Sequence, residues 1–175
     1  MVGTTSMGYV APPAVQSMSV SKRRGLMTAP LDIVVDSPAG HRILFVECKA
    51  TRKSTPEDAA HVRRNLLAHS HLPADAFFLL AIPSRLFLWN RDRGVDAPPN
   101  FTADAQPVLR DYLGSIADQE GGPRGESLEL AIASWLGDLA SNLRSPDKSD
   151  ADRMLVESGL LDKIKGGRVR TDQHL

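Results

Sequence analysis

The clearest pattern of apolar and polar positions lies in residues 30–90. Two short apolar runs rich in β-branched residues, Ile33–Val35 and Ile43–Val46, flank the sequence DSPAGH. Such a sequence favours a tight reversal, because proline fixes φ and glycine tolerates a positive φ. We therefore expect the two runs to pair as an antiparallel hairpin.

The chain after the hairpin predicts one helix and two more strands. Thr55 can cap a helix that starts at Pro56 and ends near His71. The expected apolar face of this helix consists of Ala59, Val62, Leu66 and Leu67. Two apolar segments, residues 76–82 and 85–90, follow as short strands. Strand, helix and strand in this order imply a right-handed crossover, so segments 43–49 and 76–82 should be parallel neighbours in one sheet.

Composition divides the chain into three parts. Residues 1–29 contain no Asp or Glu and are rich in Ser, Gly, Pro and Met, which predicts a mostly disordered tail. Residues 30–104 form the expected α/β core with a mixed central sheet, which ends in a loop over residues 91–104. Residues 105–175 are expected to be a helical extension packed on the core, because apolar residues recur there at helical spacing.

Charge and hydrophobicity limit the classes of function. The chain has 21 Lys plus Arg and 21 Asp plus Glu, so any polyanion must be held by a local patch. The longest apolar run, Ala76–Ile82, has seven residues and is too short to cross a bilayer. No signal-peptide pattern is evident, and the single cysteine, Cys48, fits a reducing compartment. We therefore expect a cytoplasmic protein that does not act in a membrane.

Three ionisable residues stand at the ends of the predicted hairpin strands. If Pro38 and Ala39 form the loop, Asp32 lies opposite Phe45 and one diagonal step from Glu47. Asp32, Glu47 and Lys49 then share one face of the hairpin, and Cys48 points to the other face. Diagonal neighbours are about 7–8 Å apart, so the two carboxylates could bind one divalent cation such as Mg²⁺ or Mn²⁺. The alternative is that Asp32 only caps the strand, while Glu47 pairs with a neighbouring cation in solvent.

The same residues resemble those of a known family. The segments LDIVV and VECKA, followed by an amphipathic helix and an apolar strand, are similar to the core of PD-(D/E)XK, or restriction-endonuclease-like, nucleases. The resemblance implies that Asp32, Glu47 and the backbone carbonyl of Cys48 hold Mg²⁺, while Lys49 assists the attacking water. The first helix of the family, which sometimes supplies another acidic ligand, has no evident counterpart in residues 1–29.

Basic residues after the hairpin are candidates for substrate binding. Arg63 falls on the apolar side of the predicted helix, where it needs an anionic partner unless its head group reaches water. The resemblance also implies that a polar residue of this helix points into the site. Residues 41–70 contain six Lys or Arg and three acids, which makes this segment the expected phosphate-facing surface. Arg52 and Lys53 are its further candidates.

The leading interpretation is a metal-dependent nuclease that hydrolyses phosphodiester bonds in DNA. A catalytically inactive protein of the same fold, which binds nucleic acid or a protein partner through the same face, is the first alternative. An interaction module that works through its C-terminal helices is the second. The sequence leaves open whether the protein forms a homodimer.

Overall fold

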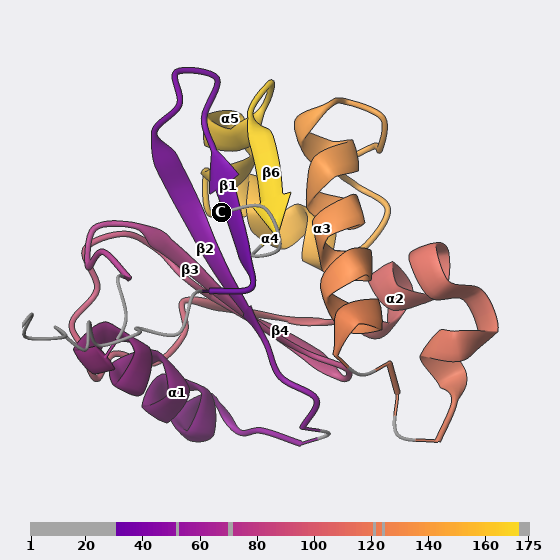
Figure 1. Cartoon of the computed structure of the whole chain (residues 1–175), viewed down its shortest axis with the longest axis horizontal. Helices are drawn as coiled ribbons and strands as arrows, with labels where there is room; N and C mark the ends of the chain where they lie inside the picture. The colour runs from indigo at the N-terminus through magenta and orange to yellow at the C-terminus, as the bar shows by residue number, and fades with distance from the viewer. Residues whose placement is uncertain (1–30, 52, 70–71, 121, 124, 172–175) are drawn as a thin grey trace, which may run out of the picture.

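A mixed six-stranded sheet forms the centre of the computed structural model (Figure 1). The structure describes residues 31–51, 53–69, 72–120, 122–123 and 125–171. The strands are β1 (Ile33–Asp36), β2 (Arg42–Cys48), β3 (Phe77–Ile82), β4 (Arg85–Trp89), β5 (Phe101–Asp104) and β6 (Arg168–Thr171). Their order across the sheet is β5-β4-β3-β2-β1-β6. Strands β2 and β3 are parallel, as predicted, and the other neighbouring pairs are antiparallel.

Helices lie on both faces of the sheet. They are α1 (Pro56–His69), α2 (Gln106–Leu113), the 3-10 helix η1 (Gly114–Asp118), α3 (Glu126–Ala140), α4 (Asp150–Glu157) and α5 (Leu160–Ile164). Helix α1 packs on one face, and α2 to α5 pack on the other (Figure 1). Side chains of β2 alternate between these layers, so Phe45 packs toward α1 while Leu44 and Val46 pack toward the larger helical layer. Within the described part of the chain, no helix is long and apolar enough to span a membrane.

Helix α1 begins where the sequence predicts. The Asp58 N–H donates to Thr55 Oγ1 at 3.2 Å, and the Thr55 N–H donates to Asp58 Oδ2 at 3.0 Å. This reciprocal capping satisfies backbone N–H groups that would otherwise lack partners at the helix start. It fixes the first turn of α1 beside the segment that leaves β2.

Two strands were missed by the sequence analysis. Strand β5 lies in the segment predicted to be a loop, and only one of its four residues is buried. Strand β6 lies in the segment predicted to be helical, and it contains two arginines. Strand β5 alternates apolar and polar residues over only four positions, and β6 has a single apolar residue, so neither gives a strong local signal for a strand. The C-terminal part of the chain therefore contributes an edge strand as well as helices, and the predicted tail lies outside the described residues.

The predicted register of the β1–β2 hairpin is wrong. The Ser37 N–H donates to the His41 carbonyl at 2.8 Å, and Phe45 pairs with Val34 instead of Asp32. The loop is therefore longer than the predicted two residues. The register also shifts next to Asp36, where Ile43 is an extra residue of β2 without a partner on β1. This irregularity has the form of a β-bulge.

Candidate functional site

Asp32 and Glu47 lie beside each other at the end of the sheet where β2 ends. Ile33 pairs with Val46, so the same register continued by one residue places Asp32 directly opposite Glu47. Asp32 Oδ2 also accepts a hydrogen bond from the backbone N–H of Cys48 at 2.6 Å. The two carboxylates are therefore direct neighbours across the strands, whereas the sequence analysis predicted a more distant diagonal pair.

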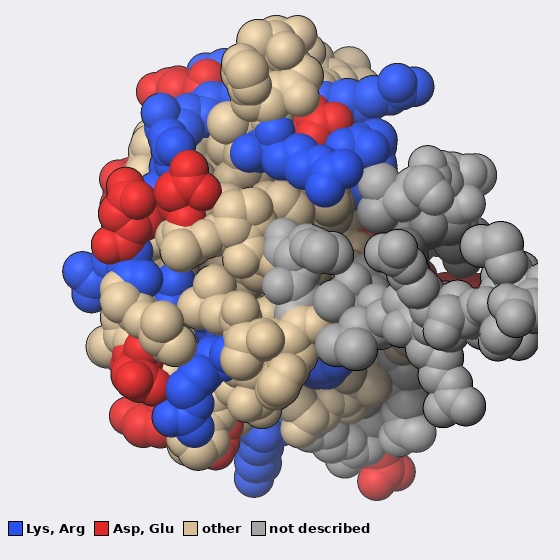
Figure 2. All heavy atoms as spheres, turned by 60° about the vertical axis from the view of Figure 1, so that its left-hand side comes forward, with Lys and Arg blue, Asp and Glu red and all other residues tan. Residues whose placement is uncertain are grey.

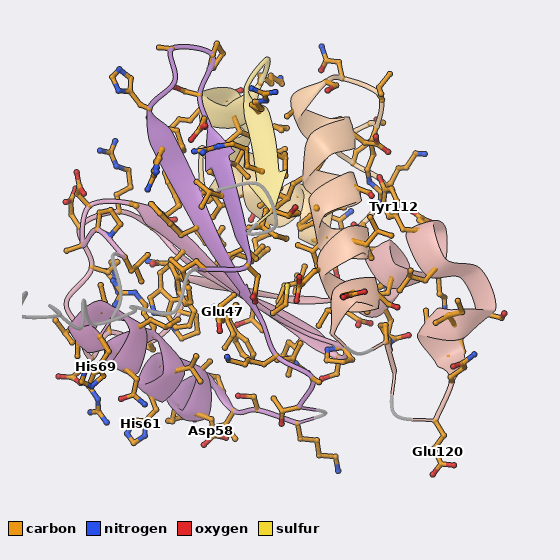
Figure 3. All side chains as sticks on the ribbon, in the orientation of Figure 1. Glu47, Asp58, His61, His69, Tyr112 and Glu120 are labelled. Atoms are coloured by element: carbon orange, nitrogen blue, oxygen red, sulfur yellow. The ribbon has the colours of Figure 1, made fainter. Side chains whose placement is uncertain are left out.

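The Glu47 carboxylate is buried, and only 9% of its side chain is exposed. Burial raises the pKa of Glu47 above its usual value. The hydrogen bond from Lys49 lowers this pKa only in part, and the negative charge of Asp32 raises it further. An ionised Glu47 is therefore held at a cost to the folded state. Figure 3 shows Glu47 on β2, close to the layer that contains α1.

Lys49 is the cation at this site. Its ammonium group donates a hydrogen bond to Glu47 Oε1, and 46% of its side chain remains exposed. Burial lowers the pKa of Lys49, but the hydrogen bond to Glu47 and the charges of Glu47 and Asp32 outweigh this effect. The net result is a raised pKa. Lys49 is therefore protonated at neutral pH and is a donor at this site, not a base.

The Cys48 side chain points away from the carboxylates, as predicted, and packs against the larger apolar cluster. Burial raises the pKa of its thiol, and the charges of Asp32 and Glu129 raise it further, which does not suit a nucleophile. The N–H and C=O of an extended residue point to the same side of a strand. Because the Cys48 N–H points to Asp32, its carbonyl faces the Asp32 side as well.

Glu129 is an acidic residue near this site that the sequence analysis missed. It lies in the first turn of α3 and is half-buried. Its negative charge helps to raise the pKa of the Cys48 thiol. Its position follows from the packing of α3 on the sheet, about 80 residues after β2 along the chain. No local pattern in the sequence indicates this proximity.

Arg63 does not have the role predicted for it. It lies on the inward side of α1, as expected, and is only 1% exposed. Its guanidinium group donates to the backbone carbonyls of Arg93 at 3.1 Å and Gly94 at 2.9 Å, and lies 5.8 Å from the centre of the Trp89 ring. Its partners are loop carbonyls, not an anion, and its head group does not reach water. Arg63 is therefore unavailable to a substrate phosphate.

The other candidate residues are not part of the acidic pair. Lys53 is exposed just before α1, and Arg52 lies outside the described residues. Asp36 is at the far end of β1, where its Oδ2 is 2.9 Å from Arg170 Nε. The exposed His61 and His69 project from the outer side of α1 (Figure 3).

The oxygen atoms at the end of β2 suit a hard divalent cation. Two carboxylates and one backbone carbonyl face the same region, and Mg²⁺ is commonly bound by one or two carboxylates together with waters and substrate phosphates. The residues that the structure describes contain no group of three or more His, Cys, Asp or Glu side chains arranged to hold a metal ion. A cation bound here would therefore depend on backbone, water and substrate oxygens for its remaining ligands.

Comparison of the chain with family models, with curated proteins and with solved structures found no match.

Proposed function

We propose that this protein is a metal-dependent nuclease that hydrolyses phosphodiester bonds in DNA. The observation that carries the proposal is the position of Asp32 beside Glu47 at the end of the sheet, next to the charged Lys49. An acid whose pKa is perturbed by burial and by a charged neighbour is a candidate for a functional site. The resemblance of the LDIVV and VECKA segments to restriction-endonuclease-like nucleases supports the same proposal, a metal-dependent nuclease.

Each residue has a distinct role in the proposed reaction. Asp32, Glu47 and the Cys48 carbonyl would hold Mg²⁺ or Mn²⁺, which supplies a bound water of lowered pKa and neutralises charge on the phosphate. Once a cation offsets the charge of Glu47, the Lys49 ammonium group can donate to the negative charge that develops on the phosphoryl oxygens. A lysine with an ordinary pKa of about 10.4 keeps the proton that this role requires at neutral pH.

A second candidate function is binding without catalysis. The Lys49 ammonium group already pairs with Glu47, and this ion pair partly neutralises the site without any metal. A protein of this kind would bind nucleic acid or a protein partner through the same end of the sheet. Metal-dependent cleavage separates the two functions, because only the nuclease requires it.

The test is nicking of supercoiled plasmid by wild type, Lys49→Ala and Lys49→Arg at equal Mg²⁺ and protein concentrations. Loss of one preorganised donor should reduce the rate about 10²–10³-fold in Lys49→Ala. Lys49→Arg keeps the charge but changes its geometry, so we expect partial activity. The matched control is Lys163→Ala, which removes an exposed lysine of α5 and should cleave like wild type.

EDTA should abolish cleavage by every active variant. Undiminished nicking by Lys49→Ala would show that the activity arises elsewhere or from a contaminant. Absence of nicking by the wild type with both Mg²⁺ and Mn²⁺ would favour the binding protein.

A further inference from the structure

Three arginines from two strands of the sheet lie around Asp36. Arg42 on β2 and Arg168 on β6 both pair with Asp36 in register, from opposite sides. Arg170, two residues further along β6, places its Nε 2.9 Å from Asp36 Oδ2 and donates from Nη2 to Oδ1 at 3.1 Å. We call Arg42, Arg168, Arg170 and Asp36 the arginine patch.

The bulge in β2 brings Arg42 into this patch. Directly paired residues of neighbouring strands project their side chains from the same face. The unpaired residue Ile43 shifts the alternation of β2 by one position, so Arg42 shares a face with Asp36. In a regular strand, Arg42 and Leu44 would share a face because they are two residues apart, and Leu44 packs in the larger helical layer. A bulge that re-aims a side chain in this way is often tied to function.

A glycine fixes the position of the third strand. A Cβ atom at Gly167 would lie 2.0 Å from the backbone oxygen of Asp36, which is closer than real Cβ atoms approach. Only glycine therefore allows the start of β6 to lie this close to the end of β1. The close approach sets Arg168 directly beside Asp36.

The patch carries an excess of positive charge. Asp36 offsets one of the three arginines, which leaves a net charge of +2. Its ion-pair partner Arg170 is partly buried, whereas Arg42 and Arg168 are exposed. In the part of the chain that the structure describes, no ion pair joins Arg42 or Arg168 to an acid. Figure 2 shows Lys and Arg side chains gathered in the upper part of that view, although the chain as a whole is neutral.

The patch and the candidate site lie on the same side of β1. Asp32 and Asp36 are four residues apart, and side chains at even spacing along a strand project from one face. At about 3.4 Å per residue, the two ends are separated by roughly 14 Å. Phosphates follow one another by about 3.4 Å along the axis of each DNA strand. A single DNA strand can therefore place one phosphate at the arginine patch and another at the Asp32–Glu47 site.

We propose that the arginine patch binds the phosphate backbone of the nucleic acid whose bond is cleaved at the Asp32–Glu47 site. The inference rests on the proposed function for its choice of nucleic acid as the partner. Guanidinium groups suit phosphate oxygens because they donate in pairs and remain charged at every relevant pH. The patch thereby supplies the local excess of positive charge that a neutral chain needs to hold a polyanion.

The test measures binding of a fluorescent 20-base-pair duplex to the whole protein in EDTA over a range of KCl concentrations. The double variant Arg42→Ala/Arg168→Ala should bind more weakly. The plot of the logarithm of the association constant against log[KCl] has a negative slope. The magnitude of this slope should decrease by about 1.8 in the double variant, since each lost phosphate contact contributes about 0.9. The matched control is Arg110→Ala/Arg153→Ala, which removes two exposed arginines from α2 and α4 and should retain the wild-type slope.

Two further variants separate lost charge from lost structure. Arg42→Lys/Arg168→Lys keeps both charges and should keep the wild-type slope. Asp36→Asn removes the one carboxylate of the patch and should bind more tightly, which a misfolded protein would not do. Wild-type affinity and slope in the double alanine variant would overturn the proposal. Displacement of DNA by poly-L-glutamate as readily as by an unlabelled duplex of equal charge would also overturn it, in favour of an acidic protein partner.

Because the assay contains EDTA, it does not depend on cleavage. Weaker binding by the double alanine variant together with a wild type that never cleaves would support the patch and contradict the nuclease. A wild type that cleaves while the arginine variants bind normally would support the nuclease and contradict the patch.

Discussion

At the scale of single residues, Glu47 is held in a charge state that the fold disfavours. Its raised pKa means that the folded protein binds a proton on this side chain more tightly than the unfolded chain does. No penalty exists below the pKa of the unfolded chain, about 4.3. The folded state loses stability as the pH rises through that value and through the raised folded pKa. At neutral pH the wild type therefore carries a penalty that a neutral side chain would avoid.

Replacement of Glu47 by glutamine should therefore stabilise the metal-free protein. In EDTA at pH 7.5 we expect a higher Tm for Glu47→Gln than for wild type, with the difference disappearing toward pH 4. Mn²⁺ should raise the Tm of the wild type, because a ligand bound only to the folded state adds about 2.7 kcal/mol at 100 times its Kd. It should not raise the Tm of Glu47→Gln or Asp32→Asn. Thermal scans with and without Mn²⁺ measure both effects.

Asp36→Asn is the control for the metal response. It removes the ion pair with Arg170 and should lower the Tm of the metal-free protein, yet leave the Mn²⁺-induced rise intact. An equal metal-induced rise in Asp32→Asn and in wild type would contradict the assignment of the cation site.

At the scale of elements, Arg63 joins α1 to the loop that follows β4. Its guanidinium group donates to backbone carbonyls of this loop and lies against the Trp89 ring, and the side chain is almost fully buried. Removal of a buried donor leaves these carbonyls without their partner and removes packed surface. The arginine thus stabilises the contact between a helix and a loop that has little secondary structure of its own.

Arg63→Ala should lower the free energy of unfolding by about 2–4 kcal/mol, because hydrogen bonds to a charged group contribute about 1.5–3 kcal/mol. The adjacent Arg64→Ala is the matched control. Arg64 forms an exposed ion pair with Asp96, and such pairs contribute about 0–1 kcal/mol. Urea unfolding of both variants measures the difference. Equal losses would show that Arg63 does not stabilise the loop.

The elements that could be predicted from the sequence are those whose signals are local. The apolar runs of β2 and β3 and the capped start of α1 are visible within a few residues, and they also imply the parallel pairing of β2 with β3. The proximity of Asp32 to Glu47 followed from side-chain alternation. This proximity was predicted correctly although the predicted turn was wrong. The predicted and observed registers differ by two residues, which keeps both side chains on the same face.

The features that escaped prediction depend on distant contacts. Strand β6 is recognised only by its pairing with β1, and Glu129 only by the packing of α3. The partners of Arg63 are backbone carbonyls, which have no signature in the sequence. The bulge at Ile43 also has no signature in the sequence, although it determines the face of the sheet from which Arg42 projects.

At the scale of the whole molecule, β6 completes the sheet beside β1. Its residue Arg170 contacts Asp36 across 134 positions of the chain. Helix α3 also packs against β6, so this strand links the larger helical layer to the hairpin that carries the candidate site. Pairing with β6 places β1 in the interior of the sheet, between two neighbours.

Gly167→Ala should weaken this attachment. The added Cβ would meet the backbone oxygen of Asp36 at 2.0 Å and that of Ile164 at 2.8 Å. Overpacking of this kind typically costs 1–3 kcal/mol. Gly137→Ala is the opposite case, because its Cβ meets nothing within 4 Å inside α3 and alanine favours the helix by about 0.8–1.0 kcal/mol. Urea unfolding should show opposite signs for the two variants, and a neutral Gly167→Ala would contradict the close approach.

The distance in sequence between β1 and β6 also has a consequence for the synthesis of the protein. A ribosome that adds 5–20 residues per second needs roughly 7–27 s to advance 134 positions. During that time β1 can pair with β2, but the N–H and C=O groups along its other side have no strand to bind. An open strand edge readily pairs with other chains. We therefore expect β1 to be the segment through which unfinished chains associate, and the segment that a chaperone would have to shield until translation has passed β6.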